Sequence, residues 1–260
     1  MKILTDTNDP LGETHLKQGF HTLHNGDHLI DVLSRVDYQE TQRAKSQMPG
    51  KFIVFEGLDG AGTTTQAHAL VDYLQSQNIE SYLTFEPTDS SIGAFIRQAL
   101  QGQCTGYHQR PLPATALALL FAADRADHWY NDIQPRLAEG TYVICDRYLY
   151  SSLAYQGLDH PQDWVSLINA YYPQPDLLFY LHVEANVAAR RRNLRQEAED
   201  LYEKNDLQIR IAHAYNQLFK KIDHQWIDGT QSIEKIHSDC LNIVQLNFLG
   251  QNDSSNDLKS

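Results

Sequence analysis

Residues 52–65 read Phe52-Ile53-Val54-Phe55-Glu56-Gly57-Leu58-Asp59-Gly60-Ala61-Gly62-Thr63-Thr64-Thr65. The first four are apolar and either aromatic or β-branched, a run typical of a buried strand. The glycines at positions 57 and 62 and the hydroxyl at position 64 fit the pattern G-x-x-x-x-G-K-[ST], in which backbone N–H groups and a helix N-terminus surround phosphate oxygens. The sequence therefore predicts a strand, a phosphate-binding loop and a helix in succession. The residues expected around the phosphates are Gly57, Asp59, Gly60, Ala61, Gly62, Thr63, Thr64 and Thr65.

The loop departs from this pattern at one position. Thr63 stands where a lysine normally meets the β- and γ-phosphates of a nucleotide. Thr64 keeps the hydroxyl group that faces Mg²⁺ in such loops, and phosphoryl transfer ordinarily needs a Mg²⁺ ion between the β- and γ-phosphates. Asp59 places a carboxylate on the side of the loop that faces the group receiving the phosphoryl group. There it would orient a hydroxyl group or hold the metal through water. Thr64 and Asp59 are therefore the candidate metal residues.

Composition and charge limit the class of protein. A chain of 260 residues, 42% of them hydrophobic, is long enough for one α/β domain with a substantial core. The net charge of −12 argues against nucleic acid polymers and anionic lipid as partners, whereas a small anion needs only a few converging arginines. Three widely spaced cysteines indicate a reducing compartment. Because the chain has neither a run of 18 apolar residues nor a secretory signal pattern, we expect no membrane association and a cytoplasmic location.

After residue 50, short apolar runs alternate with longer amphipathic stretches. This alternation predicts an α/β fold of the P-loop NTPase type, doubly wound, with a central parallel sheet of about five strands and helices on both faces. We expect residues 1–50 to form a polar, flexible N-terminal extension, residues 51–248 the domain, and residues 249–260 a disordered tail. The expected strands are Lys51–Glu56, Ser81–Phe85, Thr141–Cys145, Leu177–Val183 and Gln225–Ile227, and the expected helices include Thr64–Gln75 and Ala114–Trp129.

Two further segments carry candidate functional side chains. Phe121 and Arg125 lie four residues apart on one expected helix, so an aromatic ring can stack on a base while a guanidinium meets its carbonyl group. Asp146 and Arg147 fall at the carboxyl end of an expected strand, the edge at which α/β sheets bind ligands. The structural alternatives are core packing for Phe121, a surface ion pair for Arg125 and a buried ion pair for Asp146 and Arg147.

Together with the phosphate loop, several motifs closely resemble those of thymidylate kinases. These are Phe85-Glu86-Pro87-Thr88-Asp89, Leu119-Leu120-Phe121-Ala122-Ala123-Asp124-Arg125, Cys145-Asp146-Arg147-Tyr148, Ser151-Ser152 and Ala154-Tyr155-Gln156-Gly157. The match runs from Lys51 to Leu246, and the block from Asp146 to Gly157 is its most specific part. The resemblance implies phosphoryl transfer from ATP to dTMP in dTTP synthesis, with Mg²⁺ as cofactor, ATP bound at the phosphate loop, and a homodimeric assembly.

The resemblance also implies roles for individual residues. Arg147 resembles the arginine that grips the acceptor's phosphate, and Asp146 resembles the neighbouring acid that organises the catalytic centre. Tyr155 resembles the residue that selects deoxyribose, and residues 190–195 resemble the lid over the triphosphate. The implied dTMP-binding residues are Asp59, Phe85, Phe121, Arg125, Arg147, Ser152, Tyr155 and Gln156, and the implied catalytic residues are Asp59, Asp146, Arg147, Arg191 and Arg195.

Three basic positions common in that family are absent. Thr63 replaces the loop lysine, and Phe85 and Leu201 stand where arginines are common. The loss of one preorganised cation costs a transition state on the order of several kcal/mol if nothing replaces it. One interpretation is an active kinase in which a lid arginine, Arg191, Arg192 or Arg195, supplies the missing charge. The alternatives are a catalytically weak nucleotide-binding protein with a regulatory or assembly role, and a kinase for another nucleoside monophosphate.

Overall fold

The computed structural model describes residues 41–193 and 201–250, and in this part of the chain five parallel strands form one sheet in the order β2-β3-β1-β4-β5. The strands are β1 (Phe52–Gly57), β2 (Ser81–Phe85), β3 (Tyr142–Asp146), β4 (Leu177–His182) and β5 (Gln225–Asp228). The predicted doubly wound α/β fold is confirmed, and every expected strand lies within one residue of its observed ends. The first 40 residues of the expected extension and residues 251–260 of the expected tail lie outside the described residues.

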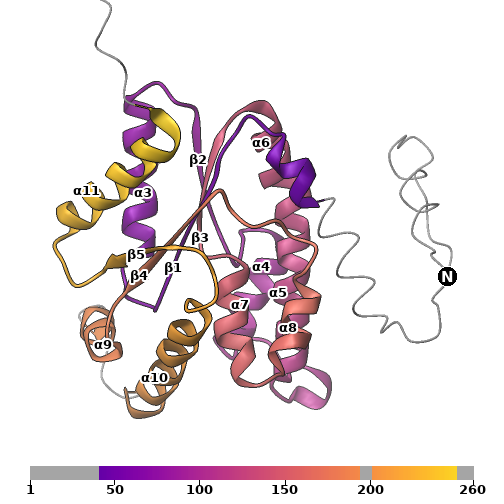
Figure 1. The fold of residues 1–260 in the computed structure, drawn as a ribbon. Helices are drawn as coiled ribbons and strands as arrows, with labels where there is room; N and C mark the ends of the chain where they lie inside the picture. The colour runs from indigo at the N-terminus through magenta and orange to yellow at the C-terminus, as the bar shows by residue number, and fades with distance from the viewer. Residues whose placement is uncertain (1–40, 194–200, 251–260) are drawn as a thin grey trace, which may run out of the picture.

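Helices cover both faces of the sheet (Figure 1). The α-helices are α3 (Thr63–Ser76), α4 (Ser91–Leu100), α5 (Ala114–His128), α6 (Gln134–Glu139), α7 (Leu149–Tyr155), α8 (Gln162–Ile168), α9 (Ala185–Asn193), α10 (Leu201–Leu218) and α11 (Ile233–Val244). Short 3₁₀ segments are η1 (Tyr107–Gln109) and η3 (Gln156–Leu158), and π-helical turns are η2 (Trp129–Ile133) and η4 (Gln245–Leu249). Helices α3 and α11 lie on one face, and α5, α7 and α8 lie on the other.

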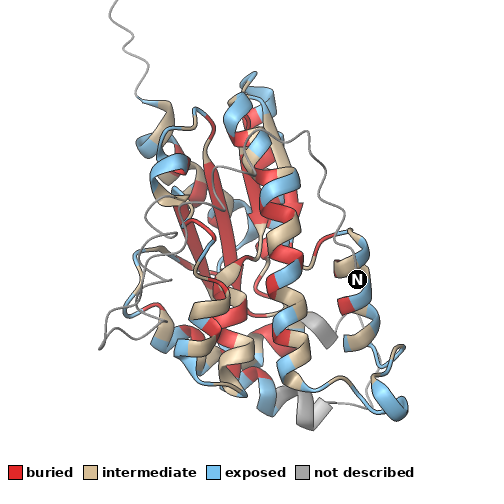
Figure 2. Ribbon diagram, turned by 90° about the vertical axis from the view of Figure 1, so that its right-hand side faces the viewer, coloured by how far each residue is buried: buried red, intermediate tan, exposed pale blue. Residues whose placement is uncertain are grey.

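The sequence explains why β1 occupies the centre of the sheet. All six of its residues are buried, as a parallel strand with neighbours on both sides and helices on both faces requires (Figure 2). The helix after it, α3, buries Ala67, Leu70, Val71 and Leu74 at helical spacing. The strand ends are in register, with Phe55 opposite Asp146 on β3 and Gly57 opposite Leu181 on β4. The loops after β1 and β3 therefore leave the same edge side by side.

Helix α5 buries its small residues more deeply than its large apolar ones. Leu117, Leu120 and Phe121 are only half-buried, whereas Ala118, Ala122 and Arg125 are buried. Small alanines allow the helix backbone to approach its neighbours closely, and the larger apolar residues beside them remain partly accessible. Phe121 is consequently not locked into the core.

Within the described residues, no helix has the length and apolar composition needed to cross a membrane.

The last residues of the expected extension contact the domain. Residues 41–46 are helical, and the ammonium group of Lys45 lies 2.5 Å from Oδ1 of Asp176, immediately before β4. Oδ2 of the same aspartate accepts the N–H of Phe52 at 2.8 Å. Burial lowers the pKa of Lys45 despite the nearby carboxylate. This contact ties the segment before β1 to the starts of both β1 and β4.

Lys45→Met is expected to lower the free energy of unfolding by about 1–3 kcal/mol, because it leaves a half-buried carboxylate without its cation. The matched control is Lys235→Met, since Lys235 also lies 2.5 Å from an aspartate oxygen, that of Asp239, but is 58% exposed where Lys45 is 8% exposed. The control should cost less than about 0.5 kcal/mol. Urea denaturation measures both variants, and equal losses would show that the Lys45 contact is only a surface ion pair.

Candidate active site

The phosphate loop joins β1 to α3 at the carboxyl edge of the sheet. Gly62 precedes α3 with a φ of 103°, a left-handed conformation that glycine adopts without strain. Gly57 is also constrained, because a Cβ atom there would lie 2.8 Å from the carbonyl oxygen of Leu181. Because Gly62 is the N-cap residue of α3 and has no side chain, no capping hydrogen bond occupies the first N–H groups of the helix. The first N–H groups of α3 are therefore available to an anion, and the helix dipole favours negative charge there.

Thr63 brings no charge to this loop. Its side chain is buried, and its methyl group Cγ2 lies 3.3 Å from the place that a Cβ atom of Gly57 would occupy. A cation reaches the loop from α9 instead, where Nη1 of Arg191 donates to the carbonyl oxygen of Ala61 across 3.4 Å. Arg195, the second predicted lid arginine, lies outside the described residues.

Thr64 and Asp146 form a pair of oxygen donors beside the loop. The Thr64 hydroxyl group donates to Oδ2 of Asp146, and Oδ1 of that carboxylate is buried without a hydrogen-bond partner among the described residues. Mg²⁺ usually binds through one or two protein oxygens, several waters and substrate phosphates. The described residues contain no cluster of three or more His, Cys, Asp or Glu side chains able to hold a metal. The pair therefore fits a Mg²⁺ ion that is held jointly with a nucleotide.

Arg147 links the phosphate loop to the acceptor side. Its Nη2 lies 2.7 Å from Oδ1 of Asp59, and its Nη1 donates to the hydroxyl groups of Ser151 at 3.3 Å and Tyr215 at 3.4 Å. The Arg147 backbone has a φ of 74°, which costs a non-glycine residue roughly 1–3 kcal/mol. Its N–H group donates to the carbonyl oxygen of Phe55 at 2.9 Å, so the backbone is fixed against β1. Such strain is typical of functional sites.

Glu56 lies near Arg147, close to the end of β1. Its carboxylate is fully buried and accepts four hydrogen bonds, from the backbone N–H groups of Tyr148 and Ser151 and from the hydroxyl groups of Ser151 and Tyr215. Burial raises the pKa of Glu56, while Arg147 and these donors oppose the rise. The N-cap residue of α7, Tyr148, makes no side-chain capping hydrogen bond. The Glu56 carboxylate instead accepts hydrogen bonds from backbone N–H groups at the start of this helix.

Arg125 and Ser152, two of the predicted dTMP-binding residues, contact each other at the other end of the site. Arg125 is only 1% exposed, and its Nη2 contacts Oε2 of Glu86 at 2.6 Å and the Ser152 hydroxyl group at 3.1 Å. Its Nη1 contacts the side-chain oxygen of Asn169, and its Nε has no hydrogen-bond partner among the described residues. The alternative of a surface ion pair is wrong for Arg125, because its ion pair with Glu86 is buried. The guanidinium is held rigidly with one donor left unused.

Tyr155 ends α7 beside Arg147, and Gln156 follows it. The ring of Tyr155 lies 5.7 Å from the guanidinium carbon of Arg147. Burial raises the pKa of Tyr155 to about 12, with Arg147 acting in the opposite direction. The side-chain oxygen of Gln156 is buried and has no hydrogen-bond partner among the described residues. Each of the two residues therefore combines a buried polar group with a position next to the acceptor-side residues in sequence.

Phe85, also predicted to bind dTMP, lies in register with Asp146 of β3 at the carboxyl edge of the sheet. It ends β2 and lines a hollow of about 340 Å³ together with Thr84, His128 and Asp132. The next residue, Glu86, pairs with Arg125 and with His128.

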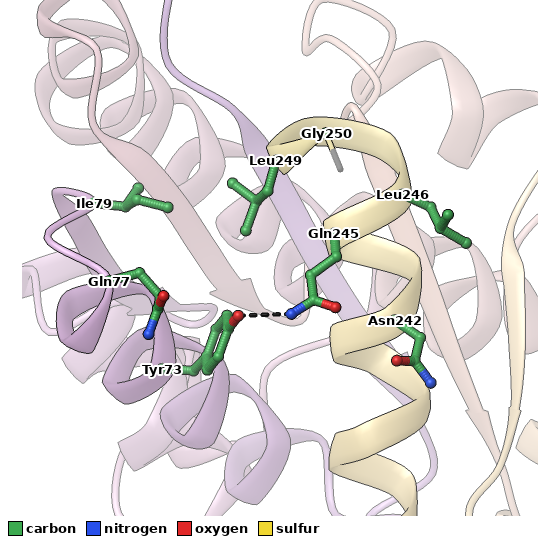
Figure 3. Close-up of a pocket in the computed structure, with 8 residues that line it drawn as sticks. All are labelled: Tyr73, Gln77, Ile79, Asn242, Gln245, Leu246, Leu249 and Gly250. Carbon is green, nitrogen blue, oxygen red and sulfur yellow. Dashed lines mark hydrogen bonds between the residues drawn. The ribbon is translucent and has the colours of Figure 1, made fainter. Parts of the chain in front are cut away.

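A larger hollow lies away from the phosphate loop (Figure 3). It has a volume of about 830 Å³ and lies between the end of α3 and the end of α11 with η4. Its lining contains no carboxylate, histidine, lysine or arginine, and Gln245 donates to the hydroxyl group of Tyr73 across it. This hollow lacks the charges needed to bind a nucleotide, so the edge beside the phosphate loop remains the candidate site.

Sequence inspection did not identify several residues that hold the site together. Glu56 directly precedes the loop glycine and could have been found by the rule that placed Asp146, namely that ligands bind at the carboxyl ends of strands. Tyr215 and Gln208 lie on α10, and Gln208 donates to Oδ2 of Asp59 at 3.2 Å. Asn169 follows α8. No local pattern marks these last three, because their contacts depend on how distant helices pack.

Comparison with known proteins gives consistent matches over the folded part of the chain. A family model described as thymidylate kinase matches residues 55–240. A probable thymidylate kinase of Pyrococcus horikoshii is 41% identical over 207 residues, which cover 78% of this chain and 100% of that protein. The thymidylate kinase of Plasmodium falciparum is 37% identical over 200 residues, covering 75% and 90%, and a putative thymidylate kinase of Treponema pallidum is 36% identical over 195 residues, covering 72% and 90%.

Proposed function

The chain belongs to the thymidylate kinase family, and we propose that it transfers the γ-phosphoryl group of ATP to the 5′-phosphate of dTMP through the residues described above, giving dTDP and ADP. The observation that carries the site assignment is the contact of 2.7 Å between Asp59 of the phosphate loop and Arg147 of the acceptor side. A donor site and an acceptor site that share one contact can hold two nucleotides with their phosphates adjacent. Positioning of this kind supplies much of the catalysis in phosphoryl transfer.

Each end of the site has a distinct task. The loop glycines and the N-terminus of α3 hold the donor phosphates, and Arg147 grips the acceptor's phosphate with a planar fork of donors. Phe121 stacks on thymine, and the rigid guanidinium of Arg125 meets the base. Tyr155 crowds the position of a ribose 2′-hydroxyl group, which selects deoxyribose. Asp146 and Arg147 are held by β3 and α7, so little reorganisation is needed when substrates bind.

Mg²⁺ is the cofactor that the oxygen donors suit. Thr64 and Asp146 would hold it, with Asp59 near enough to the acceptor phosphate to act through water. When bound, the ion neutralises charge on the phosphate oxygens during transfer. The unused Oδ1 of Asp146 is the observation that supports this assignment.

Arg191 is the residue that we assign to the work of the absent loop lysine. Its guanidinium already contacts Ala61 in the loop, and it extends from α9, the helix that leads to the lid segment. A lid arginine can reach the transferring phosphoryl group when the lid closes. The chain is then an active kinase in which Arg191 of α9 supplies the positive charge that the loop lysine usually provides.

We also infer a homodimer, formed through the helices beside the acceptor site. Helices α4 and α5 pack together and expose Phe95, Leu100 and Leu119 to solvent. Apolar side chains in such a position suit an interface between copies. Sedimentation at several protein concentrations would detect it, and a monomer throughout would contradict it. The cytoplasmic location and the absence of nucleic acid partners stay predictions from the sequence.

ADP release by the purified protein with Mg²⁺ and ATP tests the proposed function directly. We expect rapid turnover with dTMP and slower turnover with dUMP, UMP, dCMP and dGMP, because Phe121, Arg125 and Tyr155 select both thymine and deoxyribose. The comparison of dUMP with UMP isolates the effect of the 2′-hydroxyl group. Binding of ATP and dTMP without ADP release would instead favour a regulatory protein.

A further inference from the structure

Two hydroxyl groups separate Glu56 from Arg147. Ser151 and Tyr215 each donate to Oε2 of Glu56, at 2.7 and 2.8 Å, and each accepts from Nη1 of Arg147. A hydroxyl group has one proton and two lone pairs, and its proton turns toward the strongest acceptor. The two oxygens also lie 3.0 Å from each other. When both protons are directed to the buried carboxylate, lone pairs of both oxygens are left for the guanidinium. The carboxylate therefore determines which way these hydroxyl groups face.

The same carboxylate fixes the backbone that carries Arg147. Its Oε1 accepts the N–H groups of Tyr148 at 2.9 Å and Ser151 at 3.0 Å, the residues on either side of the start of α7. Arg147 immediately precedes them in a left-handed conformation that needs support from its surroundings. Four donors on two oxygens match the acceptor capacity of an ionised carboxylate. Glu56 thus contacts both the backbone and the side-chain environment of the arginine without touching its guanidinium.

We propose that Glu56 is a positioning residue for acceptor binding, acting through the hydroxyl groups of Ser151 and Tyr215 to orient the guanidinium of Arg147 toward the acceptor's phosphate. This inference rests on the proposed function, in which that guanidinium grips the phosphate of dTMP. It extends the acceptor site to α10, because Tyr215 comes from that helix. Helix α10 follows the lid segment in the chain and also sends Gln208 to Asp59.

Tyr215→Phe tests the inference by comparing the binding of dTMP with that of thymidine, which lacks the phosphate. The variant keeps the ring that stacks on Tyr180 and Phe219 but removes the hydroxyl group. We expect the dissociation constant of dTMP to rise about five- to tenfold and that of thymidine to change less than about twofold. Ser151→Ala should act in the same direction, because it removes the second hydroxyl group.

Tyr180→Phe is the matched control. Tyr180 is a buried tyrosine on β4 whose hydroxyl group donates to Asn216 of α10 at 3.2 Å, so its loss also removes one hydrogen bond to that helix. It makes no hydrogen bond to Arg147, Ser151 or Glu56 in the described structure. We expect both ligands to bind this control as they bind the unmodified protein. A general loosening of α10 would weaken dTMP binding in both tyrosine variants.

Glu56→Gln adds a direct test of the charge. Glutamine keeps an oxygen for the two backbone N–H groups but offers a donor to the hydroxyl groups, so we expect selective weakening of dTMP binding at least as large as in Tyr215→Phe. Equal weakening of thymidine and dTMP, or no change in Tyr215→Phe, would overturn the inference even if Glu56→Gln does not fold. Because binding needs no turnover, a failure of the kinase assay with intact dTMP selectivity would contradict the proposed function alone.

Discussion

Arg147→Ala is expected to lower kcat/KM for dTMP by about 10²- to 10³-fold while the dissociation constant of ATP changes less than about threefold. The guanidinium is the described cation that contacts both Asp59 of the phosphate loop and the hydroxyl groups of the acceptor side. Its removal leaves the acceptor's phosphate without a bidentate donor in both the ground state and the transition state. Its described side-chain hydrogen bonds go to Asp59, Ser151 and Tyr215 and not to the start of α3, so we expect the N–H groups that face the donor phosphates to stay in place. Steady-state kinetics in both substrates and ATP titration measure the two effects.

Arg147→Lys is the control that separates charge from geometry. Lysine keeps the positive charge and, being a non-glycine residue, the same strain at a φ of 74°. It loses the planar fork that fits a phosphate bidentately, so activity should fall between that of the alanine variant and that of the unmodified protein. If the lysine variant were fully active, a point charge would suffice and the positioning of the fork would be irrelevant. If ATP binding fell as far as dTMP activity, the residue would belong to the whole site and not to the acceptor end.

The strands and the phosphate loop could be predicted from the sequence because their signals are local. The run from Phe52 to Phe55 is apolar because β1 is buried on both faces, and the loop glycines are needed for conformations that other residues adopt with strain. Helix α3 follows the same logic, with buried residues at helical spacing. The buried face of α5 is harder to predict from the sequence. Its small residues are buried, and its large apolar residues remain partly accessible.

The candidate site was predictable only in part, and for a physical reason. Arg147, Asp146 and Thr64 belong to short motifs whose spacing reflects backbone geometry. The partners that hold them do not: Tyr215 is 159 residues from Glu56 in sequence, and Gln208 is 149 residues from Asp59. Such contacts arise from the packing of α10 against α7, which no local pattern encodes. Lys45 is a similar case, because its ion pair with Asp176 spans 131 residues and gives structure to a segment that composition marks only as polar.

Arg191→Ala is expected to lower kcat by about 10²-fold, because the donor phosphates then lose the cation that we assign to the place of the loop lysine. The contact of Arg191 with the carbonyl oxygen of Ala61 shows that its side chain reaches the loop. An exposed arginine on α10 offers the matched control: Arg210→Ala removes the same charge and should leave kcat within about twofold. Single-turnover kinetics with saturating ATP and dTMP would separate the chemical step from product release.

Thr63→Lys in both backgrounds decides whether Arg191 and the absent lysine do the same work. If they do, the added lysine should raise kcat of Arg191→Ala by about tenfold or more and change the unmodified protein much less, because one cation at the β- and γ-phosphates already suffices there. The strong coupling between positions 63 and 191 in this double-mutant cycle is the expected result. If Thr63→Lys raised kcat by the same factor in both backgrounds, the two effects would be independent. The chain would then be a kinase slowed by its threonine, and the contact between Arg191 and Ala61 would serve only to hold α9 against the loop.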